Sequence, residues 1–244
     1  MSAAHARGNL LSRLKRKNFT AAVIGLGYVG LPLAVEYADA GISVIGIDVD
    51  GVKVRTIRSG KSYIGDVPSE TIRRVVEAGL LRVTSDFSAL AEADTVNICV
   101  PTPLRKTKDP DLSYIVSAAE QVAKYIHKDM LIVLESTTYP GTTEEILVPM
   151  FEQKGFKVGR DIFIAFSPER VDPGNAQYTT KNIPKVVGGV TERRSTLAAT
   201  LYGGVLQNVH PVSCSVVAEM VKLLESTFRS VNIGLVNEIA LMCD

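Results

Sequence analysis

The chain has no tryptophan and only three cysteines, Cys99, Cys214 and Cys243, among its 244 residues. An odd number of cysteines at such wide spacing argues against a disulfide framework and against a cysteine metal site. The three histidines also lie far apart in the sequence, so we expect no metal. Free cysteines are typical of a reducing compartment, and we therefore expect the protein in the cytoplasm.

A strong charge of one sign and long apolar runs are missing as well. The net charge is +1, which gives no reason to expect nucleic acid as a partner, and no apolar run is long enough to span a bilayer. Residues 1–18 are basic but lack the apolar core of a signal peptide, so we expect a lead-in that is mobile or partly helical. With 46% hydrophobic residues, the chain has the composition of a globular protein.

A glycine-rich segment at residues 23–34 carries the strongest signal. An apolar run that predicts a buried strand ends at Gly25, which allows a tight turn. Gly27 leaves room for a pyrophosphate against the backbone, and Gly30 lets the next helix pack closely on the strand. A second apolar run ends at Asp48, 18 residues beyond Gly30, where a carboxylate can accept hydrogen bonds from a ribose diol. This spacing predicts a dinucleotide site.

The acidic residue also predicts which dinucleotide binds. The Asp48 carboxylate would repel a 2′-phosphate, which favours NAD over NADP. Lys53 and Arg55 follow closely and either counter this repulsion or lie solvated on the next helix. The phosphates are expected at the N-terminus of a helix that begins near Tyr28 and Val29, because the free N–H groups there attract anions.

Strand and helix patterns alternate along residues 19–212. This alternation predicts right-handed βαβ units, and hence a Rossmann-type α/β fold with a doubly wound, mainly parallel sheet. Thr143 is expected to cap one of the helices. In such sheets ligands bind beyond the carboxyl ends of the strands. Polar or turn-forming segments follow four of the predicted strands, at residues 25–30, 101–103, 135–141 and 167–175.

The end of the chain has a different pattern. From residue 215 to 243 one long helix is predicted, with apolar side chains spaced three or four residues apart. It would be about 40 Å long, which is more than one Rossmann layer needs. We therefore expect it to join two domains or two subunits. Its apolar positions include Val217, Met220, Val221, Leu224, Phe228, Val231, Leu235 and Ile239.

Distinctive motifs stand at residues 25–34, 100–103, 135–137, 167–170 and 218–222. Together they resemble the UDP-glucose/GDP-mannose dehydrogenase family, over almost the whole chain after Asn18. The segment at residues 167–175 is most similar to the branch that acts on UDP-N-acetylhexosamines, including UDP-N-acetylglucosamine (UDP-GlcNAc) 6-dehydrogenases. After the basic lead-in at residues 1–18, the resemblance implies an NAD-binding Rossmann domain at 19–212 and the start of a central helical dimerisation domain at 213–244.

The resemblance also implies a reaction, which supplies sugar precursors for cell-surface polysaccharides. Members oxidise the C6 alcohol of a nucleotide sugar to a carboxylate in two hydride transfers to NAD. A cysteine holds the intermediate aldehyde as a thiohemiacetal, and water cleaves the thioester that follows. Lys222 would stabilise negative charge on the C6 oxygen, Glu169 would act as a general base, and Thr137 would order the water. Alternatively, Lys222 and Glu169 are surface charges, and Thr137 is a helix N-cap or a turn hydroxyl.

Binding residues follow from the same resemblance. Arg170 would contact the UDP-sugar together with Glu169 and Lys222. Thr102 would lie against the nicotinamide half of NAD. NAD is also expected to contact the glycine-rich segment, Asp48 and Lys53. Four further residues are expected to contact it: Val100, Pro101, Ser136 and Thr137.

The sequence departs from the family at several points. Four residues beyond Lys222 the family usually has asparagine, and this chain has Ser226, whose shorter side chain would make oxyanion stabilisation either weaker or water-mediated. The family's nucleophilic cysteine lies well beyond the long helix, and the sequence stops at Asp244, before that region. Cys99 ends a predicted buried strand and is most simply a core residue. We therefore expect a chain that binds NAD, lacks the UDP-binding domain, dimerises through the long helix and is inactive alone.

Other functions fit parts of the pattern. The chain could be a non-catalytic module that binds NAD and dimerises, or part of an enzyme for UDP-glucose or UDP-N-acetylmannosamine. A single-step β-hydroxyacid dehydrogenase of the same broad superfamily is a further alternative. The segment at residues 167–175 argues against the last one, because it resembles loops built for the two-step chemistry.

Overall fold

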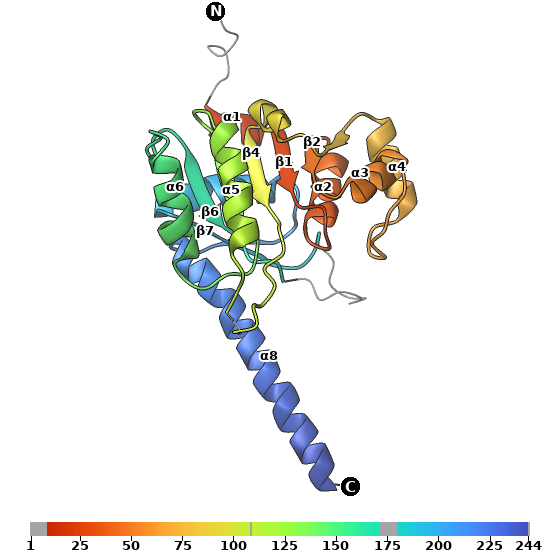
Figure 1. Cartoon of the computed structure of the whole chain (residues 1–244), viewed down its shortest axis with the longest axis vertical. Helices are drawn as coiled ribbons and strands as arrows, with labels where there is room; N and C mark the ends of the chain where they lie inside the picture. The colour runs from red at the N-terminus through yellow and green to blue at the C-terminus, as the bar shows by residue number, and fades with distance from the viewer. Residues whose placement is uncertain (1–8, 108, 171–179, 244) are drawn as a thin grey trace, which may run out of the picture.

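The computed structural model describes residues 9–107, 109–170 and 180–243, and one eight-stranded sheet forms its centre (Figure 1). The strands are β1 (Thr20–Ile24), β2 (Ser43–Ile47), β3 (Leu81–Thr84), β4 (Thr95–Ile98), β5 (Leu131–Leu134), β6 (Phe163–Phe166), β7 (Lys185–Gly189) and β8 (Val209–Pro211). Their spatial order is β3-β2-β1-β4-β5-β6-β7-β8, and only the β6–β7 pair is antiparallel. The first six have the Rossmann order, which confirms the predicted doubly wound, mainly parallel sheet.

Helices cover both faces of this sheet (Figure 1). They are α1 (Leu10–Lys15), α2 (Gly30–Asp39), α3 (Gly51–Arg58), α4 (Ser69–Glu77), the 3₁₀ helix η2 (Phe87–Glu92), α5 (Ser113–Tyr125), the π-helical turn η3 (Thr143–Leu147), α6 (Val148–Glu152), α7 (Glu192–Gly203) and α8 (Ser215–Cys243). The η2 helix was not expected from the sequence. Its Asp86 cap accepts a hydrogen bond from the Ser88 N–H at 2.8 Å.

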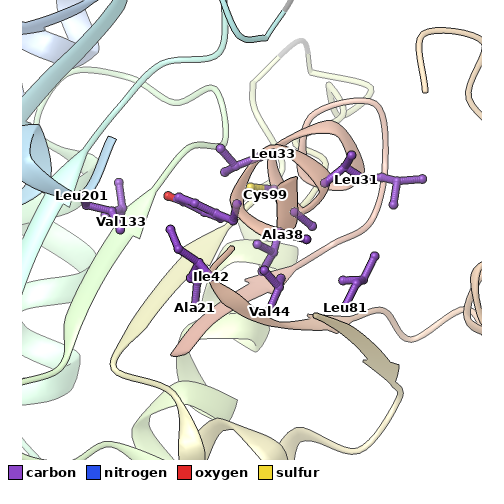
Figure 2. Close-up of a cluster of buried hydrophobic side chains, with 14 of the residues drawn as sticks. Ala21, Leu31, Leu33, Ala38, Ile42, Val44, Leu81, Cys99, Val133 and Leu201 are labelled. Atoms are coloured by element: carbon purple, nitrogen blue, oxygen red, sulfur yellow. The ribbon is translucent and has the colours of Figure 1, made fainter. Parts of the chain in front are cut away.

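The central strands bury both of their faces. In β1, Ala21 and Val23 belong to the hydrophobic cluster under α2 and α7, while Ala22 and Ile24 belong to the cluster under α5 and α6. Figure 2 shows part of the first cluster, where Ala38 of α2 lies beside Val44 of β2. Burial on both sides explains why these strands are continuous apolar runs rather than alternating ones.

The basic lead-in is helical in its second half. Leu10 and Leu14 of α1 are buried in the cluster under α7, and the Asn9 side chain caps the helix by accepting from the Leu11 N–H. The Arg13 guanidinium pairs with the Asp94 carboxylate at the start of β4. The lead-in therefore packs on the sheet domain from Asn9 onward.

One expected helix cap was wrong. Thr143 does not cap the helix, because Thr142 is the N-cap residue and neither side chain bonds to the helix's own first turn. The Thr143 hydroxyl instead donates to the carboxylate of Glu219 on α8, at 2.7 Å. This side chain therefore joins two elements that are far apart in the sequence.

The long helix α8 begins against the sheet and then leaves the domain (Figure 1). Its buried residues are Ser215, Ala218 and Glu219, all in the first two turns. A Cβ on Gly188 of β7 would lie 2.1 Å from the Cys214 carbonyl oxygen, so glycine is required for this close approach. Within the described part of the chain, no helix is both long and apolar enough to cross a membrane.

Candidate active site

A cavity of about 580 Å³ opens at the carboxyl ends of the strands. The loops after β1, β2, β4, β5 and β6 all contribute to its wall, and α8 contributes Lys222. The residues of the expected site that line it are Gly25, Gly27, Tyr28, Val29, Asp48, Lys53, Val100, Pro101, Thr102, Ser136, Thr137, Glu169 and Lys222. Ligand binding at this edge agrees with the rule for open α/β sheets.

The three glycines at residues 25–30 do not all have the same structural role. Gly25 has a φ of +90°, and a Cβ there would lie 2.6 Å from the Cys99 carbonyl oxygen. A Cβ on Gly30 would lie 1.9 Å from the Gly25 carbonyl oxygen. A Cβ on Gly27 would meet no heavy atom within 4 Å. Gly25 and Gly30 are therefore required by the fold itself, whereas Gly27 keeps open a space at the N-terminus of α2 that fits a pyrophosphate.

Asp48 stands at the end of β2 and is almost completely buried. Its Oδ2 accepts a hydrogen bond from the Leu26 N–H at 2.8 Å, and its Oδ1 accepts from the Asp50 N–H at 2.9 Å. Lys53 Nζ lies 3.3 Å from Oδ2, while Arg55 is exposed and does not line the cavity. The carboxylate is thus fixed by the glycine loop at the place where a ribose diol is expected.

The loops after β4 and β5 form the next part of the wall. The Ser136 hydroxyl donates to the Val100 carbonyl oxygen at 2.6 Å and so joins the two loops. Thr102 and Thr137 line the cavity beside them, and the Thr137 side chain is exposed. This arrangement brings together the residues expected around the nicotinamide half of NAD.

A buried polar network lies behind this wall. The Glu135 Oε1 accepts hydrogen bonds from Asn97 Nδ2 and from the Tyr202 hydroxyl, both at 2.7 Å. Its Oε2 accepts from Lys185 Nζ at 2.6 Å. Burial lowers the pKa of Lys185, but the neighbouring carboxylates of Glu135 and Glu169 outweigh it and hold that pKa above its usual range. Sequence reasoning missed Lys185, although a lysine that begins an otherwise apolar strand was a usable signal.

Glu169 and Lys222 meet beside this network. The Glu169 Oε1 accepts from the Arg170 N–H at 2.8 Å, and its Oε2 lies 3.3 Å from Lys185 Nζ. Lys222 Nζ donates to the carbonyl oxygen of Glu169 at 2.7 Å. The structure thus places both expected catalytic side chains in one cavity with Thr137.

Three of the expected site residues, Gly30, Arg170 and Ser226, do not line the cavity, and Gly30 instead packs against the backbone of Gly25. Arg170 does not line the cavity, because its guanidinium pairs with Glu225 of α8 and donates to the Pro184 carbonyl oxygen at 2.7 Å. Ser226 is exposed and does not line the cavity either. Their expected roles in substrate binding and oxyanion stabilisation stay predictions. Residues 171–175 of the loop after β6 lie outside the described residues.

Glu219 fixes the start of α8 and therefore the position of Lys222, one helical turn later. Its carboxylate accepts from the Gly141 N–H at 2.5 Å and from the Thr143 N–H at 2.9 Å. Burial raises the pKa of Glu219, while its hydrogen bonds to Thr143 and Gly141 oppose that rise. The same loop after β5 thus carries Thr137 and holds the helix that carries Lys222.

The chemistry of the cysteines bears on the site as well. Cys99 lines the cavity, but burial raises the pKa of its thiol well above the usual range, and the charge of Glu135 adds to that rise. Figure 2 shows Cys99 beside α2, among apolar side chains. A protonated, buried thiol is a poor nucleophile. Among the described residues, no group of His, Cys, Asp and Glu side chains is suited to a metal ion.

Comparison with known proteins identifies the family. The model of the UDP-glucose/GDP-mannose dehydrogenase family, NAD-binding domain, matches residues 19–206. This chain belongs to the UDP-glucose/GDP-mannose dehydrogenase family. The matched part is the family's NAD-binding domain, and the open space at Gly27 and the fixed Asp48 carboxylate fit that cofactor.

Different relatives in the family are named for different sugars. The chain is 38% identical to the UDP-N-acetyl-D-mannosamine dehydrogenase of Pyrococcus horikoshii, over 91% of this chain and 53% of that protein. It is 36% identical to the UDP-N-acetyl-D-glucosamine 6-dehydrogenase of Pseudomonas aeruginosa, over 93% of this chain and 53% of that protein. The chain thus spans about half the length of these family members.

Solved structures agree with this family assignment. The structure of the Pyrococcus horikoshii UDP-D-ManNAc dehydrogenase matches 91% of this chain and 53% of its own, with a TM-score of 0.86. The ternary complex of the GDP-mannose dehydrogenase of Pseudomonas aeruginosa matches 89% of this chain and 51% of its own, with 29% identity and a TM-score of 0.83. A 3-hydroxyisobutyrate dehydrogenase of Salmonella typhimurium, at 15% identity and a TM-score of 0.59, shares the fold alone.

Proposed function

We propose that this chain is the NAD-binding part of a nucleotide-sugar 6-dehydrogenase, with UDP-GlcNAc as its first candidate substrate. The observation that carries the proposal is the meeting of Lys222, Glu169 and Thr137 in one cavity. Asp48 follows β2 and Glu169 follows β6, so the ribose site and this cluster lie toward opposite ends of the strand order. An extended dinucleotide bound along that edge would reach the cluster with its nicotinamide.

The proposed chemistry assigns a task to each side chain. When NAD⁺ is bound, it supplies the acceptor for the hydride from C6 of the sugar. An ammonium has three N–H donors, so Lys222 Nζ can donate to the C6 oxygen while it holds the Glu169 carbonyl oxygen. The Glu169 carboxylate, at the cavity wall, can take the proton that the C6 hydroxyl or a water loses. The Thr137 hydroxyl can orient that water.

The proposal needs a thiol that the described site does not supply. Cys99 is the cysteine that lines the cavity, and its raised pKa disfavours the thiolate. We infer that the thiol comes from the part of the family's length that this sequence does not span. Each of the three cysteines is free, which supports a reducing location such as the cytoplasm.

The activity test compares two lengths of the protein. We expect the chain alone to bind NAD and to form no NADH, measured by the absorbance of the reduced nicotinamide with UDP-GlcNAc, UDP-N-acetylmannosamine and UDP-glucose. The protein continued through its relatives' full length should form two NADH per UDP-GlcNAc. In that longer form, Lys222→Met should lower kcat about 100-fold or more, the scale of losing one oxyanion donor.

The matched control is Lys154→Met, which removes an exposed lysine outside the cavity and should leave kcat unchanged. NADH formation by the chain alone would contradict the need for an outside thiol. If the longer form prefers UDP-N-acetylmannosamine or UDP-glucose, that sugar nucleotide is the substrate instead of UDP-GlcNAc. Turnover of β-hydroxyacids instead of any nucleotide sugar would overturn the proposed reaction.

We also propose that two copies of the chain associate through α8. Leu224, Phe228, Val231 and Leu235 are spaced three or four residues apart and are all more than half exposed. Such a stripe on a helix that leaves its domain matches the seam of a helical dimer. The proposed partner is a second copy, because the stripe is self-complementary in the way that an isologous interface requires.

Light scattering after size exclusion tests this association. We expect the mass of a dimer for the chain and of a monomer for the Leu224→Glu/Phe228→Glu variant, because two carboxylates in an apolar seam lose their hydration. Asn237→Glu adds a charge on the opposite side of the exposed helix and should leave the dimer intact. A monomeric chain at micromolar concentration would overturn the proposal.

A further inference from the structure

Lys185 is a buried lysine with no role in the function proposed above. Its side chain is only 3% exposed, at the first position of β7. Lysine is almost never fully buried unless it is paired, because removing an ammonium from water is costly. Its two partners are the carboxylates of Glu135 and Glu169, and its Nζ also lies 5.4 Å from the centre of the Tyr202 ring.

The two carboxylates differ in how firmly they are held. Glu135 is fully buried and fixed from the other side by hydrogen bonds from Asn97 and Tyr202. Glu169 is at the cavity wall, and its side chain is 14% exposed. Lys185 therefore links a rigid carboxylate in the core to the carboxylate that faces the cavity.

The charges around this link decide what it does. Glu135 and Glu169 are two acids that share one buried ammonium, and among the described residues Cys99 and Tyr202 also lie close to it. From α8, Lys222 contacts the Glu169 carbonyl oxygen rather than its carboxylate. Without the ammonium, two carboxylates near each other would favour uptake of a proton by one of them. Glu169 is the more accessible of the two and would be the one to take it.

We propose that Lys185 is a positioning residue, whose ammonium keeps the Glu169 carboxylate ionised and turned toward the cavity while Glu135 anchors the ammonium. The value of an ionised Glu169 rests on the proposed function, in which it accepts a proton. The ionisation itself does not depend on that function. An assay of ionisation in the chain alone therefore separates failure of this inference from failure of the proposed reaction.

The test follows the Glu169 carboxyl by NMR during a pH titration. The chain is labelled with ¹³C at the glutamate carboxyl carbon, and Glu169→Gln identifies the Glu169 signal. In Lys185→Met we expect the Glu169 midpoint to rise by about 1 to 3 pH units, the usual effect of a close opposite charge. Lys185→Arg keeps the charge and should hold the Glu169 midpoint close to that of the unaltered chain, which a merely structural role of Lys185 would not predict. Lys154→Met is the matched control and should leave the midpoint unchanged.

A second variant covers the case in which Lys185→Met does not fold. In Lys185→Met/Glu135→Gln the buried pair is neutral, and the amide oxygen of the introduced glutamine can still accept from Asn97 and Tyr202. The Glu169 midpoint should rise here too, because the ammonium at 3.3 Å is lost, but by less than in Lys185→Met, because the charge of Glu135 is gone as well. In the unaltered chain, ¹⁵N detection of Lys185 Nζ should show an ammonium that still holds its proton at about pH 10, near the usual lysine pKa. A Glu169 midpoint that does not move in either variant, or a Lys185 that loses its proton below that pH, would overturn the proposal.

The catalytic consequence can be measured in the longer form of the protein. Lys185→Met should move the acidic limb of the kcat profile to higher pH, because the base must be ionised to act. The KM for NAD should stay the same, since Lys185 does not line the cavity. The acidic limb of the kcat profile could stay in place while the Glu169 midpoint rises in the chain alone. That outcome would show that Glu169 is not the base, and the result on its ionisation would still hold.

Discussion

Gly30→Ala is expected to lower the melting temperature by about 6 to 12 °C, whereas Gly27→Ala is expected to leave it unchanged and to weaken NAD binding about 10- to 100-fold. A Cβ at Gly30 would lie 1.9 Å from the Gly25 carbonyl oxygen, which is backbone and cannot rotate away. Separating α2 from the glycine loop to relieve that contact should cost about 3 kcal/mol. A Cβ at Gly27 meets no protein atom within 4 Å, so only a bound pyrophosphate would feel it.

Calorimetry and NAD titration on the same samples measure both effects. Gly41→Ala is the matched control, because Gly41 has a φ of +83° with nothing within 4 Å and does not line the cavity. It should lose about 1 kcal/mol from backbone strain and bind NAD normally. A Gly27→Ala chain that binds NAD as tightly as the unaltered one would show that the pyrophosphate does not lie on this loop.

The cofactor half of the site was predictable because its signals are local. Gly25, Gly27 and Gly30 stand at fixed spacing, and Asp48 follows a second apolar run shortly afterwards. Parallel strands bring their carboxyl ends to one edge, so the predicted strand ends also placed Thr137 and Glu169 near each other. In the structure, Thr137 and Glu169 line the same cavity at this edge of the sheet.

The remaining features depend on pairs that are distant in the sequence. Lys185 contacts a carboxylate 50 residues away, and Thr143 bonds to one 76 residues away. Periodicity carries no information about such partners. Ser226 is a different case, because helical spacing does put it one turn from Lys222. However, Ser226 is exposed while its neighbour Glu225 still pairs with Arg170, and only the fold reveals which side of a helix stays covered.

Glu135→Gln is expected to destabilise the chain by about 3 to 5 kcal/mol, although the side chain keeps its size. The glutamine oxygen can still accept from Asn97 and Tyr202, but its amide group would face the buried ammonium of Lys185. The Lys185 ammonium would then have the Glu169 carboxylate, at 3.3 Å, as its remaining carboxylate partner. Urea unfolding monitored by circular dichroism measures the loss.

A double-mutant cycle separates the pair from its surroundings. In Lys185→Met/Glu135→Gln both charges are gone, so we expect a loss smaller than the sum of the two single losses by about 1 to 3 kcal/mol. The matched control is the exposed pair of Arg82 and Glu92, which are 2.7 Å apart with side chains 53% and 61% exposed. Glu92→Gln should cost about 1 kcal/mol or less, because water replaces the lost partner. Additive losses at Lys185 and Glu135 would mean that each side chain is stabilised by its other neighbours, and that the ammonium is not anchored by Glu135.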